Sequence, residues 1–247
     1  MSRIALAGLL FALCCGTPAR AAPALELVTL QYPPYQYQEN GEVKGFAADL
    51  VREAFRRLNL AVHISVYPWG RSIAMVTDGR ADAIFTLYRT PEREALLDYS
   101  NETLAQQEVS LFVRKDSPIS SGGRLDALSA YRFGVVRAVS YGVVFDQAVK
   151  SGQIKVGEVA ASGEQNMDML LAQRFDILVS NRLGARDILR RRHEEALVRE
   201  LSPPLEAIPS YMAFARKRSL AGLRQRFDAA LAAMKRDGSY ARLSAAP

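Results

Sequence analysis

The chain has 247 residues, of which 49% are hydrophobic and 23% are charged, and its formal net charge is +6. This composition is typical of a folded globular protein with a large core, and it excludes a low-complexity or intrinsically disordered chain. The arginines and lysines are spread along the chain rather than gathered in one patch. Binding to nucleic acid, which needs a basic patch on a recognisable module, is therefore not expected.

The N-terminal segment has the pattern of a secretory signal peptide. Arg3 precedes an apolar run over residues 4–15, and the triplet Ala19-Arg20-Ala21 supplies the small residues of a cleavage site. We expect residues 1–21 to be removed by cleavage near Ala21, which predicts a periplasmic protein. An N-terminal anchor helix is the alternative, although the apolar run is short for a membrane span.

Both cysteines of the chain, Cys14 and Cys15, lie inside this segment. Neither follows the Leu-small-small pattern of a lipoprotein, so lipidation is the less favoured alternative. After cleavage the protein would contain no cysteine, which excludes disulfides, thiolate metal sites and a cysteine nucleophile. No metal and no cofactor are expected.

Strand and helix patterns alternate in the first half of the chain. The order is strand, helix, strand, helix, strand, which predicts a parallel sheet with right-handed crossovers. The expected strands cover residues 25–30, 62–66 and 81–87, a hairpin turns at Asn40-Gly41, and the expected helices cover residues 47–58 and the segment from Trp69 to Gly79.

A polar loop is expected to leave the strand at residues 81–87, running from Thr86 to Arg93. It carries Thr86, Tyr88, Arg89 and Arg93. In an open α/β sheet, ligands bind at the loops that leave the carboxyl ends of parallel strands. The loop is therefore a candidate ligand site, and an ordinary strand-to-helix connection with solvated arginines is the alternative.

The second half repeats the alternation after a break at residues 115–118. Ser140 and Ser162 are expected to cap helices, and Asn181 lies just past the last strand of this unit. Strands are expected at residues 132–137, 154–159 and 176–179, followed by a helix at 183–192, a proline-flanked crossing at 203–209, a strand at 211–216 and a helix at 220–235.

Two similar α/β units in one chain predict two lobes. We expect lobe 1 to comprise residues 22–109, lobe 2 residues 110–207, and residues 208–247 to return to lobe 1 with the C-terminal helix. Each lobe is predicted to be a mostly parallel sheet flanked by helices.

Several motifs together resemble the family 3 periplasmic solute-binding proteins, the polar amino-acid receptors of ABC importers. The motifs are Tyr32-Pro33-Pro34-Tyr35, the run from Asn40 to Leu50, Trp69, Gly79-Arg80-Ala81-Asp82-Ala83, Thr90-Pro91-Glu92-Arg93, Asp98-Tyr99-Ser100 and Asp237-Gly238-Ser239-Tyr240. The resemblance implies a type II two-lobe clamp with crossings near residues 110 and 208, which closes on its ligand by hinge motion. It also implies a permease partner, and we expect a monomer.

The resemblance assigns roles to residues of the expected cleft. Arg93 stands where the family grips the ligand carboxylate, and a planar guanidinium matches a carboxylate with two hydrogen bonds. Tyr32 and Trp69 stand where aromatic rings surround the ligand, with core packing as the alternative. Thr86 stands where a hydroxyl or backbone group meets the ligand, and Ser140 where N–H groups at a helix start cap the carboxylate.

Two positions depart from the family pattern. Asn181 stands where the amino-acid receptors have an acid that pairs with the ligand ammonium, and a neutral amide cannot supply that charge. Tyr88 stands where a small hydroxyl residue is common. Arg137 adds positive charge near the motif positions. These departures leave room for a carboxylate without an amine, or for a more acidic ligand.

The main prediction is a periplasmic receptor for a small carboxylate-bearing solute, an amino acid or a related organic acid. An enzyme resembling cyclohexadienyl or prephenate dehydratases on the same fold is an alternative. His63 and His193 are poorly placed for acid–base catalysis, so no catalytic residue is predicted. A sensory ligand-binding module that acts on a separate membrane protein is the third possibility.

Overall fold

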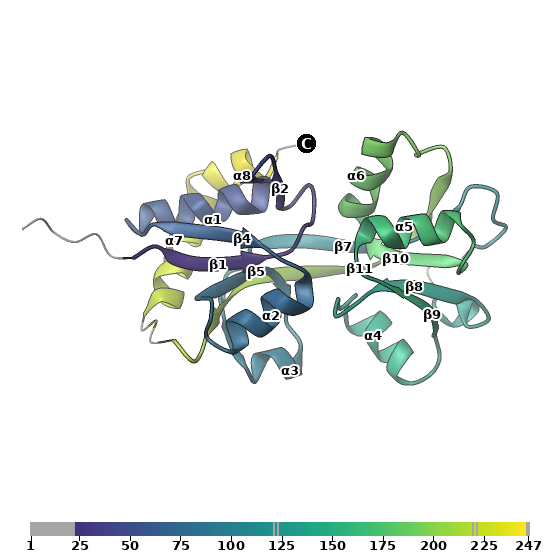
Figure 1. Ribbon diagram of the computed structural model, residues 1–247, viewed down its shortest axis with the longest axis horizontal. Coiled ribbons are helices and arrows are strands. Elements are labelled where there is room, and N and C mark those ends of the chain that lie inside the picture. The colour runs from purple at the N-terminus through teal and green to yellow at the C-terminus, as the bar shows by residue number, and fades with distance from the viewer. Residues whose placement is uncertain (1–22, 121, 123, 219, 221, 246–247) are drawn as a thin grey trace, which may run out of the picture.

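The computed structural model describes residues 23–120, 122, 124–218, 220 and 222–245. Within these residues the main sheet has nine strands in the order β4-β1-β5-β11-β7-β10-β8-β9, with β6 paired to β11. The molecule divides into two lobes joined by β7 and β11, and in each lobe helices pack beside the sheet (Figure 1). The α/β two-lobe fold predicted from the sequence is confirmed.

Lobe 1 is built on the parallel strands β4, β1 and β5, in that order across the sheet. α1 forms because its apolar residues recur at helical spacing, so that Leu50, Val51 and Phe55 are all buried on one face. The elements are β1 (Leu25–Thr29), β2 (Tyr37–Glu39), β3 (Glu42–Lys44), α1 (Phe46–Arg57), β4 (Val62–Val66), α2 (Trp69–Thr77), β5 (Ala83–Tyr88), α3 (Pro91–Glu94) and β6 (Leu97–Tyr99).

Lobe 2 has the parallel strands β10, β8 and β9, and its core contains Phe133, Phe145 and Phe175. A 3-10 turn at Asp126–Leu128 precedes its first strand. The other elements are β8 (Arg132–Val136), α4 (Val143–Lys150), β9 (Lys155–Ala160), α5 (Gly163–Leu171), β10 (Ile177–Asn181) and α6 (Arg182–Arg192).

Two long antiparallel strands, β7 (Ala105–Arg114) and β11 (Val198–Ala215), run through both lobes. The expected crossing at residues 203–209 is therefore part of a strand, and the strand expected at 211–216 starts much earlier. The prolines at 203 and 204 fall in the register shift between Leu201 and Glu206, where the pairing with β7 is interrupted. A missing N–H is tolerated at such an irregularity.

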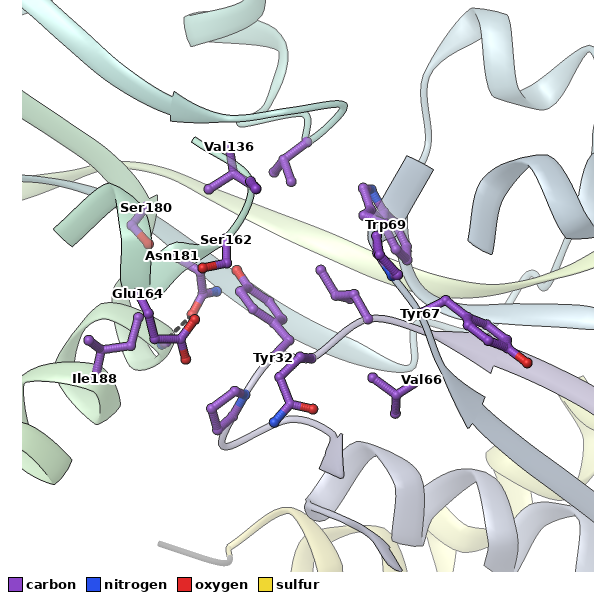
Figure 2. Close-up of a pocket in the computed structure, with 18 of the residues that line it drawn as sticks. Tyr32, Val66, Tyr67, Trp69, Val136, Ser162, Glu164, Ser180, Asn181 and Ile188 are labelled. Carbon is purple, nitrogen blue, oxygen red and sulfur yellow. Dashed lines mark hydrogen bonds between the residues drawn. The ribbon is translucent and has the colours of Figure 1, made fainter. Parts of the chain in front are cut away.

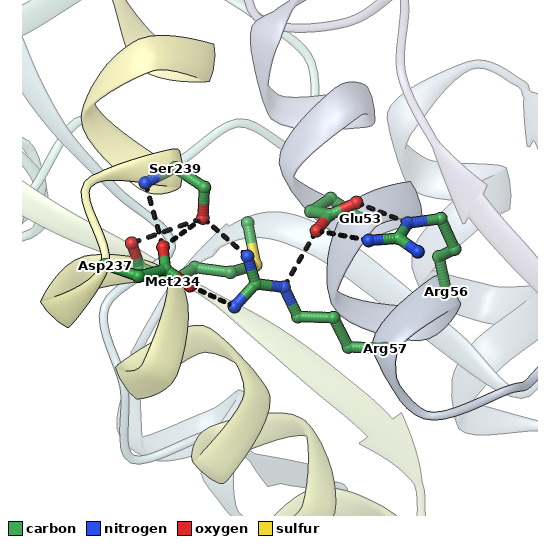
Figure 3. Close-up of polar contacts among 6 residues, drawn as sticks. All are labelled: Glu53, Arg56, Arg57, Met234, Asp237 and Ser239. Carbon is green, nitrogen blue, oxygen red and sulfur yellow. Dashed lines mark hydrogen bonds and ion pairs between the residues drawn. The ribbon is translucent and has the colours of Figure 1, made fainter.

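The C-terminal helices α7 (Leu223–Arg236) and α8 (Ser239–Ser244) pack against α1. Phe227 of α7 lies against Phe55 of α1, with ring centroids 5.6 Å apart. Figure 3 shows the polar part of this junction, in which Arg57 donates to Glu53 on α1 and to both Asp237 and Ser239 at the start of α8. α8 was missed from the sequence, where the last expected helix covered residues 220–235.

Among the described residues, no helix is long and apolar enough to cross a bilayer, and no group of three potential metal ligands is present.

Candidate functional site

Two connected chambers lie between the lobes. The inner chamber measures about 40 Å³, and Arg93, Thr86, Tyr88, Gln107 and Ser140 contribute to its wall. The outer chamber measures about 330 Å³, and Figure 2 shows Tyr32 and Trp69 of lobe 1 facing Ser162, Glu164 and Asn181 of lobe 2 across it. The residues that line both chambers, and so mark where they join, are Leu30, Tyr32, Trp69, Val139, Tyr141 and Asn181.

Arg93 supplies the positive charge of the inner chamber. It lies on the short helix α3, whose first turn is capped by the Thr90 side chain accepting from the Arg93 N–H at 3.4 Å. Its guanidinium donates to the carbonyl of Tyr88 at 3.4 Å and, across the cleft, to the carbonyl of Ala138 at 3.2 Å. Burial lowers the pKa of Arg93, although a guanidinium stays protonated in proteins. No carboxylate of the described residues lies within 4.0 Å of it.

Thr86 and Tyr88 belong to β5 rather than to the polar loop expected there. β11 pairs with Phe85 and Leu87, and Thr86 is the extra residue of a bulge between them, with φ of 61°. A β-branched residue at positive φ is strained, and bulges often occur beside binding sites. Its hydroxyl accepts from Gln36 Nε2 at 2.9 Å and donates to the Phe85 carbonyl at 2.6 Å.

A buried polar network forms the floor of the inner chamber. Asn181 Nδ2 donates to Tyr35 Oη and to Gln107 Oε1, both at 3.2 Å, and Tyr88 Oη donates to Gln107 Oε1 at 3.0 Å. Asn181 Oδ1 accepts the N–H of Gly184 at 2.9 Å and so caps α6. Burial raises the pKa of Tyr35 to about 12 and that of Tyr88 still further, so both hydroxyls are neutral at physiological pH.

Tyr32 and Trp69 form the aromatic wall on the lobe 1 side. Tyr32 stacks on Tyr35 with ring centroids 5.4 Å apart, and Trp69 begins α2 directly after Pro68. Trp69 is 8% exposed and also packs in the core of lobe 1. Both rings therefore have a structural contact on one side and the cleft on the other.

Ser140 lies in the inner chamber but does not cap a helix as expected. α4 begins at Val143, with Gly142 before it, and the Ser140 hydroxyl donates to Asp146 of that helix. The N–H of Val144 is taken by Glu206 Oε2 at 3.2 Å. Gly142, with φ of 95°, permits this approach, since a Cβ there would lie 2.4 Å from that oxygen. Ser162, by contrast, caps α5 as predicted, accepting from the Gln165 N–H at 3.1 Å.

Arg137 is not brought into the cleft. It is exposed and lines neither chamber, while the other seven expected site residues line one or both of them.

Residues 27–246 match the sequence profile of the bacterial extracellular solute-binding proteins, family 3. The chain belongs to this family. The resemblance read from its motifs is confirmed. A search among proteins of curated function gave no significant match.

Three solved structures similar to this family 3 protein are 20–22% identical to it in sequence, and at this level the likeness shows the fold alone. A histidine kinase sensor domain with similarity to periplasmic binding proteins is 20% identical, with a TM-score of 0.79 over 90% of this chain and 94% of that one. An ancestral arginine-binding protein bound to arginine is 22% identical, with a TM-score of 0.76 over 89% and 96%. The substrate-binding protein of an amino acid ABC transporter is 21% identical, with a TM-score of 0.73 over 90% and 97%.

Sequence reasoning missed several cleft residues of this family 3 protein. Gln107 has the same strand parity as the apolar Ala105 and Val109, and this alternation could have marked it as an inward-facing polar residue. Tyr141 and Glu164 carry no comparable signal, because they follow turns whose direction depends on the tertiary fold.

Proposed function

We propose that this solute-binding protein captures a small carboxylate-bearing solute, with Arg93 holding the carboxylate in the inner chamber. The observation that carries the proposal is a guanidinium in an interlobe cavity, bonded only to carbonyls and with no acidic partner among the described residues. A carboxylate would supply two charge-assisted hydrogen bonds in the geometry that a guanidinium prefers. Tyr32, Trp69, Thr86, Tyr88, Ser140 and Asn181 would form the remaining wall.

The proposed role is that of a monomeric periplasmic receptor, exported by a signal peptide, which delivers its ligand to the permease of an ABC importer. The likeness to an ABC transporter substrate-binding protein supports this role. We propose residues 110–207 as lobe 2, inserted between the two parts of lobe 1 at 22–109 and 208–247. Closure of the lobes would then bend β7 and β11.

A sensory role is the second candidate, favoured by the likeness to a histidine kinase sensor domain. Deletion of the gene separates the two roles once a ligand is known. Import predicts that cells lose uptake of that ligand, whereas sensing predicts that uptake persists and the transcriptional response to the ligand is lost.

The binding proposal is tested by a calorimetric and thermal-shift screen of the chain lacking residues 1–21. The panel comprises amino acids, dicarboxylates, keto acids and prephenate, the last because dehydration of prephenate would reveal the alternative enzyme. Arg93→Ala should weaken binding of any hit at least 100-fold, about 3 kcal/mol, because a bidentate charged pair is lost. Arg80→Ala, which changes an exposed arginine of the same lobe, is the matched control. Unchanged affinity in Arg93→Ala would contradict the proposal.

A further inference from the structure

One of the polar side chains that line the inner chamber is charged. Arg93 carries this charge, and the other polar residues that line this chamber among those described are hydroxyls and amides, with no acid. Asp146 does not line the chamber, and its carboxylate accepts hydrogen bonds from the Ser140 hydroxyl and the Tyr141 N–H. A ligand ammonium placed beside the carboxylate would lose part of its water and meet no acid on the chamber wall, which is costly. The charge of the inner chamber thus favours an anion and disfavours a zwitterion.

The hydrogen bonds of this chamber point to the same conclusion, because their directions are fixed by a backbone group. The Gly184 N–H can only donate, so the Asn181 atom that it meets is the oxygen and the other terminal atom is the NH₂ group. That NH₂ donates to Gln107, which fixes the Gln107 oxygen on the side of Asn181 and Tyr88. The Gln107 Nε2 group is left buried without a partner among the described residues.

The side-chain amide oxygens of this chamber and the Thr86 hydroxyl each already accept at least one hydrogen bond from the protein. Asn181 Oδ1 holds Gly184, Gln107 Oε1 receives two donors, and the Thr86 hydroxyl receives Gln36. Among the side chains that line the inner chamber, the buried group without a partner is a donor, Gln107 Nε2, which together with Arg93 can serve the oxygens of a carboxylate. The buried Gln36 Oε1 also has no partner among the described residues, but Gln36 does not line the chamber.

The outer chamber indicates the body of the ligand. Its walls are largely apolar and aromatic, with Tyr32 and Trp69 on one side and Val136 and Ile188 on the other. A cavity of roughly 150 Å³ is enough to hold benzene, so the chamber's volume of about 330 Å³ accommodates an aromatic ring with a short chain. The acid on its wall, Glu164, is paired with Arg191 at 3.3 Å, which offsets its charge.

We propose that the ligand is a carboxylate without an adjacent amine, carrying an aromatic or similarly flat apolar body, such as an arylalkanoate. The carboxylate lies at Arg93 and Gln107, and the ring occupies the outer chamber between Tyr32, Trp69 and the lobe 2 wall. The inference rests on the proposed function, since it takes Arg93 as the carboxylate anchor.

The test is calorimetry with a matched pair, 3-phenylpropanoate and L-phenylalanine, which differ only in the amine. The expected result is binding of 3-phenylpropanoate at least tenfold tighter than that of phenylalanine. Equal or tighter binding of phenylalanine overturns the inference. If neither binds while another carboxylate, such as arginine, binds in an Arg93-dependent way, the inference fails and the proposed function stands. If no carboxylate of either panel binds, both fail.

A second test adds a negative charge to the cleft at position 181, where it should favour a ligand that carries an amine. Asn181→Asp keeps the oxygen that caps Gly184 and lets the Gln107 amide turn to donate, so the fold should be retained. It should shift the preference toward phenylalanine at least tenfold relative to the parent protein. Asn101→Asp, the same change at an exposed turn outside the cleft, should leave the preference unaltered. An Asn181→Asp protein with the parent's preference would place the amine discrimination elsewhere and overturn the inference.

Discussion

The two lobes begin their helices in different ways. In lobe 1, α1, α2, α7 and α8 start at glycine or proline without a side-chain cap. Burial holds these helices in place, and Arg57 also links α1 to the junction between α7 and α8. In lobe 2, α4 also starts at a glycine without a cap from that residue, but α5 and α6 are capped by Ser162 and Asn181, and both of these side chains also face the cleft. The capped helix of lobe 1, α3, is the one that carries Arg93.

In lobe 1, the residues that hold the helices together are not the residues that line the cleft. In lobe 2, the same residues do both. Lobe 1 keeps its helix junction on α1, away from the chambers, so changes there should alter stability alone. In lobe 2, Asn181 ends β10, caps α6 and lines the cleft, and Ser162 caps α5 and lines the cleft. Substitutions at those residues should therefore change stability and affinity together.

Asn181→Ala should give the largest combined effect. The loss of the α6 cap costs about 1 kcal/mol, and the loss of the amide donor leaves Tyr35 and Gln107 short of a partner, which adds about 1 kcal/mol. We expect urea denaturation to show a loss of about 2 kcal/mol, with weaker ligand binding in calorimetry. Stability lost with no change in affinity would break the coupling proposed for lobe 2.

Ser162→Ala isolates a cap with fewer partners. Its hydroxyl accepts only the Gln165 N–H among the described residues, so the expected loss is about 1 kcal/mol in urea denaturation. Ser162→Thr should restore most of this stability, because threonine is also a good cap. If both variants were equally destabilised, the effect would arise from packing instead of capping.

Acid titration of Glu53 should have the smallest effect, confined to lobe 1. Hydrogen bonds from Arg56 and then Arg57 lower the pKa of Glu53 from 4.5 to about 2. Its ion pairs therefore stabilise the protein fully above about pH 4.5, and this stability is lost as the pH falls to about 2. Glu53→Gln should remove roughly 0.5 kcal/mol at pH 7 and flatten the stability curve over that range.

Ligand affinity at pH 7 should be the same in Glu53→Gln and the parent protein. Glu42→Gln, at an exposed hairpin position without an ion pair among the described residues, is the control. A change of affinity in Glu53→Gln would show that the α1 junction communicates with the cleft.

The fold could be predicted where each element carries its own pattern. The strand at Val62–Val66 and the cap at Ser162 follow local rules of alternation and capping. The bounds of β11 could not be predicted, because prolines in a sequence usually indicate the end of a strand. Only the pairing with β7 shows that the prolines at 203 and 204 lie at an irregularity within the strand. The α4 cap was mispredicted because Glu206, distant in sequence, takes the role expected of Ser140.

The candidate site was predictable as a set of residues but not as a network. Arg93 and Trp69 follow from the motifs, and both line the inner chamber. The positive φ of Thr86 depends on a bulge set by β11, and the orientation of Gln107 depends on a backbone N–H in the other lobe. Such features require knowledge of which strands pair, so they have no local signature.

The two strands that join the lobes limit how the lobes can move. β7 and β11 are paired from Ala105 and Ser210 through to Arg114 and Val198, with one interruption. Sliding one strand along the other would break this ladder, whereas twisting or bending a two-stranded ribbon keeps its hydrogen bonds. Shear between the lobes is thus resisted and torsion is permitted. A partner protein that contacts both lobes would therefore respond to a change in the angle between the lobes, and not to a sliding of one lobe past the other.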